Sequence, residues 1–111
     1  MPKILIAEDE QDILELITFT LQFGGYEVIP TSNGKDALEM TRKEQPDLVL
    51  LDVRMPRLSG YDVCTQVKAD LDTRHIPVVF LLQKVKKLRS KQDLILERLI
   101  IFSNLLLPII S

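Results

Sequence analysis

Short apolar runs alternate with segments of helical periodicity along the first 81 residues of the chain. Four apolar runs predict β-strands, at residues 3–7, 26–29, 47–51 and 76–81. Three segments between them carry apolar residues at a spacing of three to four and predict helices, at residues 12–23, 35–43 and 61–71. Strands that alternate with helices predict an α/β fold in which right-handed crossovers build a parallel sheet.

The same pattern predicts which side chains form the core. The run Leu48–Leu51 contains no polar residue, which is typical of a strand that is covered on both faces. We expect the third helix to turn three apolar residues inward: Val63, Val67 and Leu71. We expect four aromatic side chains to lie in the core: Phe19, Phe23, Tyr26 and Phe80.

Acidic residues directly follow two of the predicted strands. Asp52 comes after Leu48–Leu51, and Glu8 and Asp9 come after Ile4–Ala7. Ligands of open α/β sheets bind at the carboxyl ends of the strands. If these two strands are neighbours, the three carboxylates converge there, and a hard divalent cation with oxygen ligands is the usual way to relieve their repulsion.

Composition restricts the class of protein. The 111 residues are 46% hydrophobic and 27% charged, which is typical of one globular domain and excludes a disordered chain. The chain has a single cysteine, so it cannot form an internal disulfide. It shows neither a basic-then-apolar leader nor an apolar stretch of about 18 residues. We therefore expect a cytoplasmic protein without a membrane partner.

The net charge of −2 is unevenly distributed along the chain. Residues 1–81 contain 8 basic and 14 acidic residues, whereas residues 82–111 contain 6 basic and 2 acidic residues. A nucleic-acid patch is one interpretation of the basic segment, but the segment has few aromatic residues and no known motif. We favour a solvated basic helix face and expect no nucleic-acid partner.

Several of these segments resemble the receiver domain of two-component response regulators. The resemblance is carried by Ile4–Glu10, Pro46–Pro56, Ser59-Gly60 and Ile76–Val79, which together span about three quarters of the chain. The combination of an acidic pair with Asp-x-x-Met-Pro is specific. The resemblance implies a flavodoxin-like, doubly wound parallel sheet with the strand order 2-1-3-4-5.

The resemblance also implies a role for each acidic residue. Asp52 would be the phosphoacceptor, which takes a phosphoryl group from a histidine kinase or phosphotransfer protein in a phosphorelay. Asp9 would bind Mg²⁺ directly and Glu8 would bind it through water, while the backbone carbonyl of Arg54 would complete the protein ligands. The implied protein is a signalling domain and not an enzyme.

The quoted motifs stop at Leu81. Receiver domains carry Ser or Thr at the next position, where this chain has Leu82, and a lysine at a position that falls level with Asn104. Both groups contact the phosphoryl group in the family. Each charge-assisted contact is worth roughly 1.5–3 kcal/mol. We therefore expect phosphorylation to be poorly coupled to a conformational switch in this chain.

The departure divides the chain into a receiver-like core, residues 1–81, and a tail, residues 82–111. Codons can be chosen for residues 82–89 and 97–106 so that another reading frame encodes receiver-like sequence, including a Lys-Pro pair. Because two separated matches in one frame are improbable by chance, we infer a frameshift near residue 81. An authentic, divergent tail is the alternative.

The tail itself has an amphipathic pattern. Apolar residues recur at a spacing of three to four over residues 83–107, which predicts one helix that Pro108 ends. An edge strand at residues 99–102 is the less favoured alternative. A helix here would replace strand 5 and helix 5 of the family, and its apolar stripe predicts a homo-oligomer in which tails cross between subunits.

Two other functions and one structural explanation compete with the phosphoacceptor interpretation. An interaction module of receiver fold would keep the fold without phosphorylation. An aspartate-nucleophile phosphohydrolase would need Asp-x-Asp, but Arg54 stands two residues after Asp52. Helix N-capping would explain Glu10 and Asp12 before the first helix, but it does not explain an acidic residue after four apolar ones.

Overall fold

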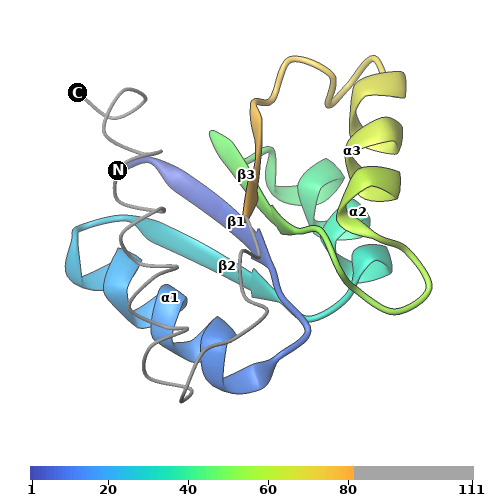
Figure 1. The fold of residues 1–111 in the computed structure, drawn as a ribbon. Coiled ribbons are helices and arrows are strands. Elements are labelled where there is room, and N and C mark those ends of the chain that lie inside the picture. Colours follow the sequence, from blue (N-terminus) through green and yellow to red (C-terminus); the bar gives the residue numbers. More distant parts are fainter. Residues whose placement is uncertain (82–111) are drawn as a thin grey trace.

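A computed structural model of the chain describes residues 1–81 (Figure 1). Its elements are β1 (Lys3–Ala7), α1 (Gln11–Phe23), β2 (Glu27–Thr31), α2 (Gly34–Glu44), β3 (Leu48–Asp52), α3 (Gly60–Ala69) and β4 (Val78–Leu81). The predicted order of strands and helices is therefore confirmed, with boundaries that move by one or two residues. The helix predicted at residues 83–107 lies outside the described residues.

The four strands form one parallel sheet in the order β2-β1-β3-β4. This order agrees with the first four positions expected from the resemblance to receiver domains. β2 lies along one edge of β1, and β3 lies along its other edge with β4 beyond it. The carboxyl ends of β1 and β3 therefore meet at the point where the strand order reverses, which is where open α/β sheets bind ligands.

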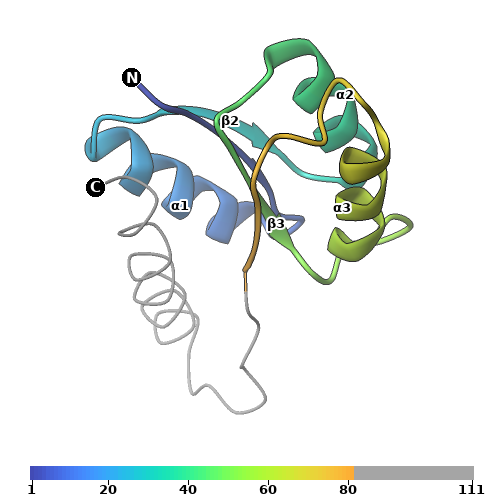
Figure 2. The same ribbon diagram turned by 90° about the horizontal axis from the view of Figure 1, so that it is seen from above.

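Helices cover both faces of the sheet, α1 on one face and α2 with α3 on the other (Figures 1 and 2). Side chains alternate along β1, so Ile4 and Ile6 pack in the core cluster under α1 while Leu5 and Ala7 pack in the cluster under α2 and α3. The residues Leu48–Leu51 are each at most 2% exposed. The prediction of a strand covered on both faces is thus confirmed.

Capping side chains mark the starts of α2 and α3, and a glycine follows the end of α1. Asn33 accepts a hydrogen bond at 2.8 Å from the backbone N–H of Asp36 at the start of α2. Ser59 and Asp62 form a reciprocal capping box at the start of α3, with hydrogen bonds of 3.2 and 3.0 Å. Beyond the end of α1, Gly25 has a φ of +93°, a conformation that glycine adopts at little cost.

The prediction of a core position is wrong for three residues. Leu71 is 74% exposed because α3 ends at Ala69, before the turn of helix that would have carried Leu71 inward. Phe19 and Phe23 are 66% and 87% exposed on α1. Other side chains already form the buried stripe of this helix: Ile13, Leu14, Ile17 and Leu21. The phenylalanines therefore lie outside the stripe that faces the sheet.

Tyr26 and Phe80 meet the expectation in part. Both are half-buried, and each packs against one of the two core clusters.

Among residues 1–81, none of the helices is long and apolar enough to cross a membrane.

Candidate metal centre

The register of the sheet places Glu8 level with Asp52. β1 pairs with β3 so that Ala7 lies beside Leu51, and the residue that follows each of them in the sequence is an acid. Both Glu8 and Asp52 have an exposed fraction of 0%, whereas Asp9 is exposed. Two carboxylates are thus held below the surface with a third above them, at the carboxyl edge of the two central strands.

The three predicted carboxylates do converge. One carboxylate oxygen from each of Glu8, Asp9 and Asp52 lies within 4.8 Å of the other two. At an effective dielectric constant of about 20, two unit charges at this separation repel by about 3 kcal/mol. A bound cation would offset this repulsion.

Backbone N–H groups hold two of these carboxylates in place. The N–H of Arg54 donates to Asp52 Oδ1 at 3.3 Å, and the N–H of Glu10 donates to Glu8 Oε2 at 3.4 Å. Glu10 is the N-cap residue of α1, but its side chain makes no capping hydrogen bond, contrary to the capping explanation. The Arg54 side chain is exposed.

Gly60 supports the backbone of Asp52, a role that the sequence interpretation missed. The N–H of Gly60 donates to the carbonyl oxygen of Val53 at 3.0 Å. A β-carbon at Gly60 would overlap the backbone carbonyl oxygen of Asp52 and would lie 3.0 Å from the Asp52 carbonyl carbon and from Val53 Cα. The only signal in the sequence was that Ser59-Gly60 belongs to the resembling motif.

The donor set fits a small, hard divalent cation. All three donors are carboxylate oxygens, the ligand type that Mg²⁺ and Mn²⁺ prefer. Neighbouring ligands of octahedral Mg²⁺ are about 3 Å apart, since each bond is about 2.1 Å. The three oxygens lie within 4.8 Å of one another, so side-chain movement or an intervening water would bring them into the range of one ion.

Two predicted departures from the family concern residues outside the described part. Leu82 and Asn104, which stand at the positions of the family's hydroxyl and lysine, both lie beyond residue 81. Within the described part, β4 ends at Leu81, which lies beside Asp52 in the sheet. The last described residue of β4 is therefore at the edge of the sheet that carries the carboxylates.

Comparison with known proteins gives one family. The sequence model of the response regulator receiver domain matches residues 4–95, so the family pattern reaches further into the tail than the quoted motifs. The chain is 46% identical over 79 residues to the probable transcriptional regulator ycf27 of Porphyra purpurea. That alignment covers 71% of this chain but only 31% of the relative, so the chain spans about a third of that protein's length.

Solved structures give the same answer. The N-terminal domain of a response regulator receiver protein from Methanoculleus marisnigri is 32% identical, with a TM-score of 0.74 over 84% of this chain and 76% of that one. The Mn²⁺-bound form of response regulator Rcp1 is 25% identical, with a TM-score of 0.72 over 93% of both chains. With its parallel sheet and acidic cluster, this chain belongs to the response regulator receiver domain family.

Proposed function

We propose that this chain is a phosphoacceptor domain of a phosphorelay and that Asp52 accepts the phosphoryl group. The observation that carries the proposal is the position of Asp52, a fully buried carboxylate within 4.8 Å of two others at the switch point of the sheet. Membership of the receiver family supports it. The donor would be the phosphohistidine of a histidine kinase or phosphotransfer protein, which would meet this chain in the cytoplasm.

The proposed metal ligands are the carboxylates of Glu8, Asp9 and Asp52 and the backbone carbonyl of Arg54, with Mg²⁺ as the ion. A bound Mg²⁺ would offset the charge of the cluster and withdraw charge from the phosphoryl oxygens. The spacing of the carboxylates supports this set. The Mn²⁺-bound form of Rcp1, a related structure, supports a divalent ion in this family.

Asp52 is the nucleophile in the proposed transfer. One of its carboxylate oxygens forms a bond to phosphorus while the phosphorus–nitrogen bond of the donor phosphohistidine breaks, and the imidazole leaves with that electron pair and takes up a proton. The Arg54 N–H orients the carboxylate through its bond to Oδ1. Gly60 lets the backbone of Asp52 pack against the start of α3.

We also propose that the chain signals weakly. A hydroxyl and a lysine contact the phosphoryl group in receiver domains, and Leu82 and Asn104 stand at those positions in the sequence. Leu82 has no hydrogen-bond donor in its side chain, and Asn104 cannot carry the positive charge of a lysine. Phosphorylation of Asp52 would therefore produce a smaller structural response than in a receiver domain with both groups.

The proposal is tested by incubating the full chain with acetyl phosphate and Mg²⁺ and measuring its intact mass. One phosphoryl group should be added to the wild-type chain and none to Asp52→Asn, while the exposed Asp72→Asn should behave as wild type. An adduct on Asp52→Asn would assign the acceptor elsewhere. A wild-type chain that binds Mg²⁺ without forming an adduct would contradict phosphorylation and favour the interaction module.

We further propose that residues 1–81 form the receiver-like core and that chains associate through residues 82–111. β4 has a strand neighbour on one side only in the described sheet, and three of its four residues are half-buried. An incompletely paired strand with apolar side chains favours association. The apolar stripe predicted in the tail supplies a surface to cover it.

A further inference from the structure

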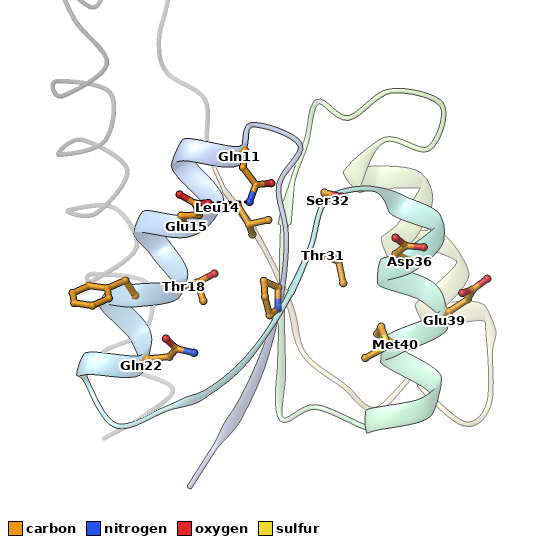
Figure 3. Close-up of a pocket in the computed structure, with 12 residues that line it drawn as sticks. Gln11, Leu14, Glu15, Thr18, Gln22, Thr31, Ser32, Asp36, Glu39 and Met40 are labelled. Atoms are coloured by element: carbon orange, nitrogen blue, oxygen red, sulfur yellow. Dashed lines mark hydrogen bonds between the residues drawn. The ribbon is translucent and has the colours of Figure 1, made fainter.

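A groove lies between α1 and α2 on the outer side of β2 (Figure 3). Its volume is about 640 Å³, and Pro30 and Thr31 of β2 lie between its two helical walls. None of Glu8, Asp9 and Asp52 lines it. The groove is therefore separate from the proposed phosphorylation site.

The charged residues that line the groove are all acidic. Glu15 projects from α1, and Asp36 and Glu39 project from α2 (Figure 3). No lysine, arginine or histidine is among the described residues that line it. Glu39 makes no hydrogen bond or ion pair within residues 1–81, so its carboxylate is available to a partner. This charge favours a cationic occupant and disfavours the phosphorylated and carboxylated metabolites.

The rest of the lining is largely apolar and includes an exposed aromatic ring. Leu14 and Phe19 from α1 and Met40 from α2 belong to this lining, and Phe19 is 66% exposed. Exposed aromatic side chains that border a groove are typical of protein interaction surfaces. The groove thus offers apolar contacts between two acidic walls.

In the part of the chain that the structure describes, Thr18 places a polar atom without a hydrogen-bond partner in the wall of the groove. Its Oγ1 atom is buried and has no hydrogen-bond partner among the described residues, although the side chain lines the groove. Thr20 on the same helix shows the usual alternative, since its hydroxyl donates to the Leu16 carbonyl oxygen at 2.8 Å. Because Oγ1 is covered in this structure, an occupant gains a hydrogen bond to it only where the neighbouring atoms move aside.

We propose that this groove binds a basic amphipathic helix of a partner protein. Apolar side chains on one face of the helix would contact Phe19 and Met40, and lysine or arginine side chains beside them would pair with Glu15 and Glu39. Addition of a strand to β2 is disfavoured because Pro30 has no N–H to donate. A helix satisfies its own backbone groups and needs none from the groove.

The test uses the full chain and a synthetic probe. The probe is a peptide of about five helical turns, built from Leu, Ala and Lys so that leucines form one face and lysines flank it. A matched control peptide carries Glu in place of Lys. Binding is measured by fluorescence anisotropy, and the contacted residues are identified from backbone amide NMR shifts.

We expect the basic peptide to shift residues of α1 and α2 around the groove and the acidic peptide to shift none. Phe19→Ser and Glu39→Lys should each weaken binding at least about tenfold, because one removes an apolar contact and the other reverses a charge. Phe23→Ser and Asp72→Lys are controls that alter an exposed phenylalanine and an exposed acid outside the groove, and they should stay within about twofold.

Several results would overturn the proposal. Equal binding of the acidic peptide, or equal affinity in all four variants, would show that the groove is not the site. Shifts confined to the backbone of β2 would indicate strand addition instead of a helix. A homo-oligomer of the full chain that Phe19→Ser dissociates, as measured by light scattering, would assign the groove to a second copy of this chain.

Discussion

Gly60 lies so close to Asp52 that no side chain fits between them: a β-carbon on Gly60 would overlap the Asp52 carbonyl oxygen. Gly60 is the first residue of α3, and Ser59 before it caps the helix. The start of α3 therefore packs directly against the end of β3, and the backbone that carries Asp52 is held from behind.

Replacing Gly60 by alanine should displace this backbone. We expect Gly60→Ala to lower the free energy of unfolding by about 1–3 kcal/mol, because the methyl group meets backbone atoms that cannot rotate away. Urea denaturation measures the change. Gly24→Ala is the control, since a β-carbon there meets neighbours at 3.4 Å, and its stability should stay within about 1 kcal/mol of wild type. Equal stability of the two variants would contradict the close packing.

Removing one charge from the acidic cluster should stabilise the metal-free chain. We expect Asp52→Asn to raise the free energy of unfolding in EDTA by about 1–3 kcal/mol, because fewer like charges remain within 4.8 Å and an Asn oxygen still accepts from the Arg54 N–H. Mg²⁺ should then stabilise the wild type more than the variant. Thermal denaturation with and without Mg²⁺ measures both effects.

Two results would contradict this prediction. A variant that is less stable than wild type in EDTA would show that repulsion does not dominate the cluster. An equal stabilisation of wild type, Asp9→Ala and Asp52→Asn by Mg²⁺ would place the metal elsewhere. The exposed Asp72→Asn serves as the charge-matched control in each case.

Asp70 should make stability depend on pH in the acid range. The backbone N–H of Asp72 donates to Asp70 at 2.9 Å, and this bond, together with the Arg42 guanidinium at 3.0 Å, lowers the pKa of Asp70 below its ordinary value. A lowered pKa stabilises the fold above the unfolded-state pKa, and this contribution is lost as the pH falls through the folded-state pKa.

The Asp70→Asn variant should therefore be less stable than wild type at neutral pH, and the two should converge as the pH falls through the folded-state pKa of Asp70. Denaturation midpoints between pH 2 and about pH 7 measure the convergence. Arg42→Gln should reduce the pH dependence of stability less than Asp70→Asn does. The reason is that the hydrogen bond from the Asp72 backbone, and not the Arg42 guanidinium, is the larger cause of the lowered pKa of Asp70. A constant difference between Asp70→Asn and wild type at all pH values would refute the assignment.

The tail should control the oligomeric state. We expect light scattering at micromolar concentration to show a dimer or larger particle, and we expect Leu99→Glu or Phe102→Glu to shift it toward the monomer by placing a charge on the predicted apolar stripe. Ser90→Glu lies on the opposite side of the predicted helix from the stripe and should leave the particle unchanged. A monomeric wild-type chain would contradict association through the tail.

The sequence by itself determined the order of the elements and the identity of the acidic residues. Strand and helix periodicities are local properties, so the four apolar runs and three amphipathic segments could be recognised without knowing their partners. The buried run that ends in Asp52 was recognisable for the same reason. These local signals account for the agreement between the predicted elements and those found in residues 1–81.

Only the tertiary structure decided which of these elements meet. The pairing of β1 with β3 brings Glu8 level with Asp52, and it depends on contacts between residues far apart in sequence. The exposure of Phe19 depended on which face of α1 the sheet covers, and four other residues already filled that face. The contact of Gly60 with Asp52 and the groove between α1 and α2 arise in the same way, because both form between elements that share no local pattern.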